Sequence, residues 1–118
     1  MKISIPLINN KISDHFGGAD SFFIAEIGDN GEIVREFTQT PPEHAPGVYP
    51  KWLKSENVDI LLTKSIGGRA IAFLKDYGIK VITGINNGEP SKIVSEYIKG
   101  NISSSNEFCA GSGNCSEH

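Results

Sequence analysis

Apolar residues are spaced along the chain in five segments that predict β-strands, at residues 2–7, 21–27, 32–39, 58–63 and 79–83. In the first segment, Ile3, Ile5 and Leu7 alternate with other residues and so share one face of a strand. The second segment is apolar at nearly every position, which is typical of a strand covered on both faces. Asn30 and Gly31 favour a hairpin turn before the third segment, because both tolerate positive φ. The first three segments therefore predict an antiparallel meander.

Helices are expected at about residues 50–57, 68–77 and 90–99. Pro50 suits the first position of its helix, since proline has no N–H to lose there. The predicted order is β-β-β-α-β-α-β-α, and its strand–helix–strand units require parallel crossovers. The fold class is therefore a mixed five-stranded α/β sheet of ribonuclease-H-like type. We expect one domain at residues 1–100 and a flexible tail at residues 101–118.

Composition and charge weigh against several classes of function. The chain has 118 residues and a formal net charge of -3, whereas non-specific binding to nucleic acid requires a basic surface. No apolar run approaches the length of a membrane span, and the first residues lack the apolar core of a signal peptide. We therefore expect a cytoplasmic monomer that binds neither nucleic acid nor membrane.

Four loops of the predicted fold meet at one edge of the sheet, at residues 8–20, 40–48, 64–68 and 84–89. These loops contain His15, His44, a glycine pair at Gly67 and Gly68, and Gly84. Helices begin near the same edge, and helix N-termini present free N–H groups and partial positive charge. Two imidazoles beside an anion-attracting, glycine-lined edge suit an anionic metal cluster.

Simpler interpretations of the same residues stay open. His15 could pack against Phe16 in a surface turn, and His44 could be an exposed loop residue without a ligand. Gly67 and Gly68 resemble half of a phosphate-binding loop, but the Gly-Lys-Ser/Thr sequence that such a loop needs does not follow them. A nucleoside triphosphate site is therefore not expected.

The predicted tail contains Cys109, Cys115 and His118. Glycine and serine between the cysteines would let them bend around a metal ion or close a disulfide. Their five-residue separation is not a zinc-finger spacing. In a cytoplasmic protein, ligation or redox chemistry is the more common use of two nearby cysteines. We expect an accessory metal-binding arm.

Four short motifs occur in order along the chain, SDHFG at 13–17, HAPG at 44–47, IGGRA at 66–70 and GIKV at 78–81. Together they resemble the dinitrogenase iron–molybdenum cofactor biosynthesis family, which includes the NifX proteins and the C-terminal domain of NifB. The resemblance covers about residues 1–100. It implies a ribonuclease-H-like fold and a protein that carries or stores iron–molybdenum cofactor or its iron–sulfur precursors.

The resemblance also implies roles for individual residues. His15 and His44 would face the cluster, and Gly67, Gly68 and Gly84 would line its seat. The expected function is thus that of a binding or carrier protein for an iron–sulfur or iron–molybdenum-type cluster. Such a protein would work with cluster-assembly proteins and would not itself be an enzyme.

Two alternatives belong to other functional classes. One is a metal-free regulatory or interaction module in which the histidines are incidental. The other is a ribonuclease-H-like hydrolase, whose chemistry needs several carboxylates around two metal ions. Residues 2–7 contain no acid, and Asp59 begins its strand at the opposite edge of the sheet, so the sequence disfavours the hydrolase.

Truncation after Ile102 tests the expected role of the tail. The composition of residues 103–118 offers few apolar contacts, so the shortened chain should stay folded. Metal capture or transfer should slow, because Cys109, Cys115 and His118 are removed. Circular dichroism and the rate of metal loading would check these two outcomes. Loading and delivery at the full-length rate would show that the tail has no such role.

Overall fold

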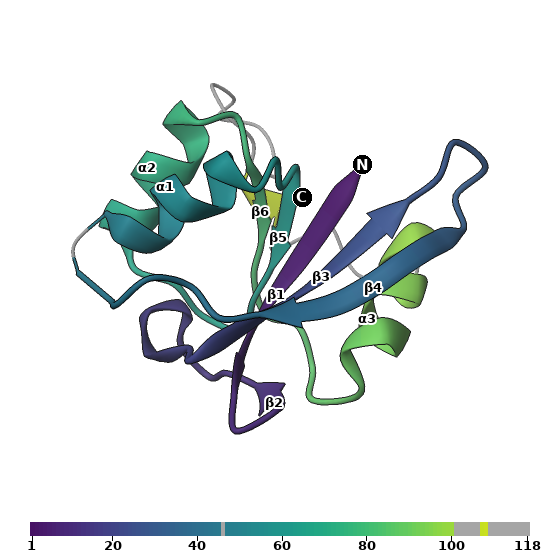
Figure 1. Cartoon of the computed structure of the whole chain (residues 1–118), viewed down its shortest axis with the longest axis horizontal. Coiled ribbons are helices and arrows are strands. Elements are labelled where there is room, and N and C mark those ends of the chain that lie inside the picture. Colours follow the sequence, from purple (N-terminus) through teal and green to yellow (C-terminus); the bar gives the residue numbers. More distant parts are fainter. Residues whose placement is uncertain (46, 101–106, 109–118) are drawn as a thin grey trace.

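The computed structural model of the protein describes residues 1–45, 47–100 and 107–108 (Figure 1). The strands are β1 (Lys2–Ile8), β2 (Lys11–Ile12), β3 (Ser21–Ile27), β4 (Ile33–Gln39), β5 (Ile60–Leu62), β6 (Lys80–Ile82) and β7 (Glu107–Phe108). The helices are a single 3-10 turn, η1 (Phe16–Gly18), and the α-helices α1 (Val48–Ser55), α2 (Gly68–Asp76) and α3 (Pro90–Ile98).

The strands form one mixed sheet in the order β4-β3-β1-β5-β6-β7, with β2 paired to β1 beside this path. β1, β3 and β4 pair antiparallel, whereas β5 and β6 run parallel to β1. The predicted meander and the predicted parallel units are therefore confirmed, and the fold is ribonuclease-H-like α/β. The five predicted strands are its five longest strands. β2 and β7, with two residues each, were not predicted.

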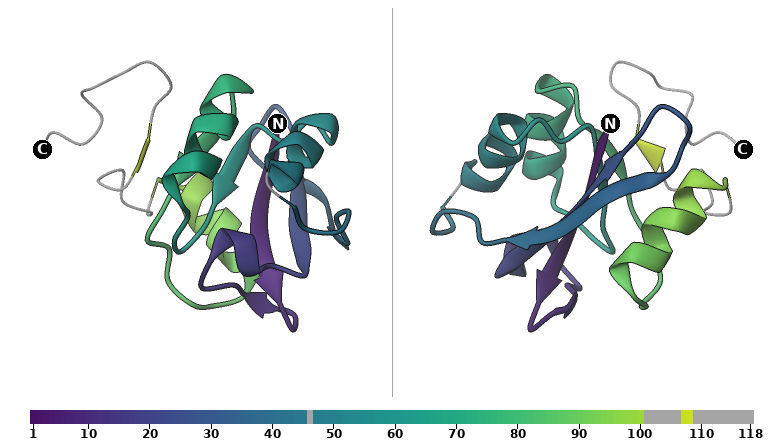
Figure 2. Two further views of the ribbon diagram at one scale, coloured as in Figure 1. Left: turned by 90° about the vertical axis from the view of Figure 1, so that its left-hand side faces the viewer. Right: turned by 45° about the vertical axis from the view of Figure 1, so that its right-hand side comes forward.

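Helices cover both faces of the sheet, with α1 and α2 on one face and α3 on the other (Figures 1 and 2). Each face has its own apolar core. The core on the α3 face includes Ile3, Ile5, Phe23, Leu62 and Val94. The core on the face of α1 and α2 includes Phe16, Phe22, Tyr49, Leu53 and Leu74. Within the described residues, no helix has the length and apolar character needed to span a membrane.

β1 is buried on both faces, although its sequence alternates. Ser4 and Pro6 lie between the predicted apolar positions, and both are buried. The reason is position, because β1 sits between β3 and β5 in the centre of the sheet, where both faces are covered. The alternating pattern predicted one buried face for this strand, whereas the structure buries both faces.

α1 begins at Val48, two residues before the predicted start at Pro50. Pro50 occupies the third helical position, whose N–H would have no partner within the helix in any case. Gly47 precedes the helix with φ 78°, a left-handed conformation that favours glycine. The position of Pro50 thus marked the first turn of α1 but not its first residue.

The predicted loop at residues 8–20 contains more structure than expected. Asn9 and Asn10 have φ of 53° and 66° and form a two-residue turn, after which Lys11 pairs with Ile8. Asparagine tolerates this left-handed conformation better than most residues, and two such residues favour a tight hairpin. The turn folds β2 back along β1 and thereby places the following segment, which contains His15, at the end of the sheet.

The expected flexible tail lies largely outside the described residues. Within it, β7 pairs antiparallel with β6, with Phe108 opposite Val81. Cys109, Cys115 and His118 are not among the described residues, so their predicted metal-binding role stays a prediction.

Replacing Phe22 tests the importance of the core beneath α1. Phe22→Ala should lower the free energy of unfolding by about 3–5 kcal/mol, the usual cost of removing a buried aromatic ring. The side chain is fully buried and contacts the rings of Phe16, Tyr49 and Trp52. Urea denaturation would measure the loss. Val34→Ala on β4 is the control, because Val34 is 64% exposed and its loss should cost less than about 1 kcal/mol. Equal losses would contradict this account of the core.

Candidate functional site

The four predicted loops meet at one edge of the sheet, the lower edge in Figure 1. β1, β4, β5 and β6 point toward this edge, since β4 and β1 both run antiparallel to β3. The loops that follow these strands therefore lie together, as expected. We call this the loop edge.

His15 is held by the segment that follows β5. Its Nδ1 lies 2.7 Å from Ser65 Oγ, and the Ser65 hydroxyl donates a hydrogen bond to the Asp14 carbonyl at 2.8 Å. The Phe16 N–H donates to the Ser65 carbonyl at 2.9 Å, which ties the two loops through their backbones as well. His15 is exposed, so its ring is oriented by these contacts while still open to a ligand.

His44 lies close to the same loop. A Cβ placed on Gly17 would be 3.7 Å from His44 Nε2, so His44 lies against the loop that contains His15. The His44 ring packs edge-on against Tyr49, with ring centroids 4.8 Å apart. His44 is exposed like His15. The structure thus places the ring of His44 against the loop that contains His15, although the two histidines lie far apart in the sequence.

An aromatic cluster beneath the loop edge anchors both histidine loops. We define it as Phe16, Phe22, Tyr49 and Trp52. Phe16 follows His15 and packs against Phe22 and Tyr49, with centroids 5.8 and 5.9 Å apart. The Tyr49 hydroxyl donates to the Ala19 carbonyl at 2.7 Å. Burial, and to a lesser extent the charge of Asp20, raise the pKa of Tyr49 above its ordinary value of 10.0. Tyr49 therefore remains a hydrogen-bond donor at neutral pH.

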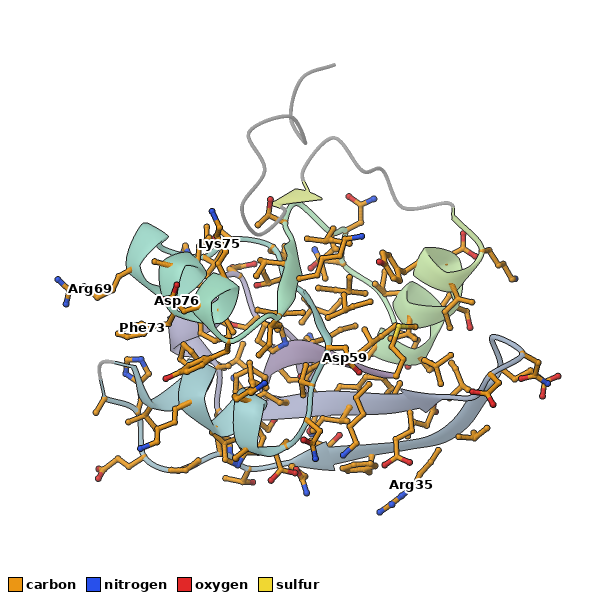
Figure 3. The ribbon with its side chains drawn as sticks, turned by 90° about the horizontal axis from the view of Figure 1, so that it is seen from above. Arg35, Asp59, Arg69, Phe73, Lys75 and Asp76 are labelled. Atoms are coloured by element: carbon orange, nitrogen blue, oxygen red, sulfur yellow. The ribbon has the colours of Figure 1, made fainter. Side chains whose placement is uncertain are left out.

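Gly67 and Gly68 stand at the N-terminus of α2. No side chain of the described residues caps this end, and a Cβ on either glycine would meet nothing within 4 Å. The N–H groups of the first turn have no partner inside the helix, so they are free to meet an acceptor from outside. Figure 3 shows Arg69 and Phe73 projecting from the same side of α2. The Phe73 ring reaches the loop of His44, 3.4 Å from the place of a Cβ on Gly47.

Gly84 lies at the loop edge, in the segment that follows β6. It has φ of 75°, and its N–H donates to the Lys64 carbonyl at 3.0 Å. It therefore ties the end of β6 to the segment after β5. Its link to His15 passes through Lys64 and Ser65.

Lys64 and Ser65 were not singled out from the sequence. Lys64 Nζ lies 2.8 Å from Asp14 Oδ1 and 2.8 Å from Asn87 Oδ1, so it connects two of the loops. The hydrogen bond from Lys64, and then its charge, lower the pKa of Asp14 below the ordinary value of 3.8. Their position directly after a predicted parallel strand could have indicated them, because polar residues at such positions lie at the carboxyl edge of the sheet.

A groove of about 650 Å³ also lies at the loop edge. It runs between the β1–β2 turn and the segment before α3, and it is lined by Asn9, Lys11, Asp14, Asn87 and Glu89 among others. His15 and His44 are not among its lining residues. In the part of the chain that the structure describes, no three His, Cys, Asp or Glu side chains are grouped to hold a metal ion.

Comparisons with known proteins agree with this architecture. A protein of Methanocaldococcus jannaschii named MJ0580 is 36% identical over 86 residues, which cover 69% of this chain and 72% of that protein. The crystal structure of PH0822 is 29% identical, with a TM-score of 0.79 over 87% of this chain and 95% of that one. The protein MJ0327 of M. jannaschii shares the fold at 24% identity, with a TM-score of 0.73 over 92% of this chain and 94% of that one.

Residues 1–100 match the family described as dinitrogenase iron-molybdenum cofactor. The matched segment includes every described element up to the end of α3 and all the motifs on which the resemblance rested. The chain belongs to the dinitrogenase iron-molybdenum cofactor family.

Proposed function

We propose that this protein binds an iron–sulfur or iron–molybdenum-type cluster, or a precursor of one, as cargo at the loop edge. It would carry or store that cluster during cofactor assembly. The observation that supports this most directly is that both imidazoles are exposed at the loop edge, with His44 Nε2 lying against Gly17 of the loop that contains His15. Family membership makes such a cluster the natural cargo to test.

The donors at the loop edge suit both parts of a metal–sulfur cluster. Iron and molybdenum accept imidazole nitrogen, and sulfides accept hydrogen bonds from N–H groups. The uncapped first turn of α2 offers such N–H groups and the positive end of a helix dipole. Because Gly67 and Gly68 add no side chains there, a bulky anion could approach the backbone closely.

The same arrangement favours a carrier over a tight permanent site. Within the described residues no three His, Cys, Asp or Glu side chains are grouped to hold a metal ion, so the two imidazoles are not part of a complete ligand set. Two ligands on exposed loops leave the remaining coordination positions of a cluster to its own sulfides or to a partner. Cargo held in this way can be released to a cluster-assembly protein.

The carboxylates are not arranged as a hydrolase would need them. A two-metal hydrolase gathers several acids around its ions. Asp14 is paired with Lys64 at the loop edge, whereas Asp59 accepts a hydrogen bond from the Lys2 N–H at the opposite edge. This separation supports binding of a cluster over hydrolysis.

Anaerobic purification tests the proposal directly. The protein would be purified without oxygen, analysed for iron, molybdenum and sulfide, and then reconstituted with ferrous iron and sulfide. A bound cluster should give visible absorption in proportion to the metal content. A protein that takes up no metal under either condition is a metal-free module, and the proposal is then wrong.

Replacing the histidines should weaken cluster binding without unfolding the protein. His15→Ala or His44→Ala should lower the affinity for a reconstituted iron–sulfur cluster by about tenfold to a hundredfold, the scale of losses at metal sites. Both side chains are exposed, so the thermal midpoint should change little. Titration followed by visible absorption measures the affinity.

The matched control for the histidines is the pair Lys54→Ala and Lys99→Ala. These exposed cations lie at the C-terminal ends of α1 and α3, away from the loop edge. They should leave cluster binding unchanged. Full cluster uptake by the double variant H15A/H44A would refute the assignment of the histidines.

Lys64 and Asp14 provide a test of charge at the loop edge. For an anionic cargo, Lys64→Met should weaken binding and Asp14→Asn should strengthen it, because one change removes a positive and the other a negative charge. Solvent screens charges at such a surface, so shifts of no more than about fivefold are expected. Equilibrium binding of tetrathiomolybdate at low salt would measure them. Shifts in the same direction would mean that the ion pair acts only by holding the loops.

A further inference from the structure

We infer that Ser65 is a positioning residue for His15. It holds the imidazole in the tautomer with the proton on Nδ1, so that the lone pair of Nε2 is free to coordinate a metal. The inference deepens the proposed function and rests on it for its biological meaning. Its structural content can be tested without any cluster.

The direction of each hydrogen bond around Ser65 follows from the atoms involved. A serine hydroxyl has one hydrogen to donate. The Asp14 carbonyl oxygen lies 2.8 Å from Ser65 Oγ and can only accept, so the hydroxyl hydrogen goes there. His15 Nδ1 lies 2.7 Å from the same oxygen, so this second contact is a hydrogen bond only if Nδ1 donates.

The protonation of Nδ1 decides what the other nitrogen can do. A neutral imidazole carries one proton, and a ring that holds it on Nδ1 leaves Nε2 with an unprotonated lone pair. Metal-ligating histidines are typically fixed in this way by a partner on the second nitrogen. The Ser65 hydroxyl is therefore placed where the partner of a metal-ligating histidine belongs.

Both members of the pair are themselves held in place. The Ser65 carbonyl accepts hydrogen bonds from the Phe16 N–H at 2.9 Å and the Thr63 hydroxyl at 3.3 Å. On the other side, the buried Ser13 hydroxyl donates to the His15 carbonyl at 2.7 Å and lies 3.3 Å from the His15 N–H. The backbones of His15 and Ser65 are thus both fixed by hydrogen bonds, which keeps the two side chains within hydrogen-bonding distance.

This arrangement narrows the class of cargo. A cluster that meets His15 would need a metal with an open or exchangeable coordination position, because Nε2 offers a lone pair and not a proton. His44 is held differently, by packing of its ring against the ring of Tyr49. The two histidines are therefore not equivalent, and His15 is the one prepared to coordinate.

Nitrogen-15 NMR of the histidine side chains tests the inference in the metal-free, full-length protein. Spectra would be recorded over a series of alkaline pH values, up to the point at which the signals no longer change with pH and report the neutral tautomers. His15 signals would be assigned with His15→Gln. Wild-type His15 should show a protonated Nδ1 and an unprotonated Nε2. Ser65→Ala should shift the proton toward Nε2, and Ser65→Thr, which keeps the hydroxyl, should restore the wild-type pattern.

The control variant is Ser55→Ala, which removes a hydroxyl that also donates to a backbone carbonyl, that of Trp52, at the end of α1. It should leave the His15 signals unchanged. A proton on Nε2 in the wild type, or an unchanged tautomer in Ser65→Ala, would overturn the inference.

Binding measurements separate this inference from the proposed function. Ser65→Ala should lower the affinity for a reconstituted iron–sulfur cluster by about tenfold, as loss of a ligand's hydrogen-bond partner does elsewhere. Ser65→Thr should recover most of it. If the wild type binds no cluster but shows the Nδ1 tautomer, the proposed function fails while the positioning role of Ser65 stands. If the wild type binds a cluster and Ser65→Ala binds it equally well, the positioning role fails alone.

Discussion

The packing of Phe16, Phe22, Tyr49 and Trp52 is the interaction on which the loop edge depends. Phe22 lies near the start of β3 and is fully buried, and the other three rings are brought to it by a 3-10 turn and a helix. The edge-to-face contacts have centroids 5.2–5.9 Å apart, a range in which such pairs add stability beyond their buried area. Phe16 directly follows His15 in the sequence, and the ring of Tyr49 contacts the ring of His44. The position of both imidazoles is therefore set by the core and not by the loops alone.

A second tie comes from the segment that leaves β5. This segment contacts several of the other loops through Thr63, Lys64 and Ser65. Ser65 by itself makes three such contacts, with Asp14, His15 and Phe16. These contacts are polar and partly exposed, so each contributes little stability by itself. Their effect is geometric, since they hold exposed side chains in a defined orientation on a rigid sheet. Such an edge can present ligands to a bulky anion without enclosing it.

Much of the fold could be predicted from local signals. Residues 21–27 were predicted as a strand and form β3 with the same bounds, because a continuous apolar run can only be satisfied by cover on both faces. Asn30 and Gly31 marked the hairpin between β3 and β4, since Gly31 adopts φ of 82°. Pro50 marked the start of α1 only to within two residues, because proline fits any position of a helix's first turn. The two-residue pairing of β2 was missed, as a strand that short has no periodicity to detect.

The sequence by itself determined the order of the five longest strands and the three α-helices, the edge at which their loops meet, and the residue types of the proposed cluster site. It did so because hydrophobic periodicity and turn residues are local signals, which involve only residues close in the sequence and can be recognised without the fold. Only the tertiary structure decided which side chains touch. Ser65 and His15 are separated by 50 positions, and their contact exists because β1 and β5 are parallel neighbours, so that the segments following them leave the sheet at the same edge. Likewise, the approach of His44 to Gly17 follows from the packing of Tyr49 on Phe16 and Phe22, a contact between distant segments that no local pattern encodes.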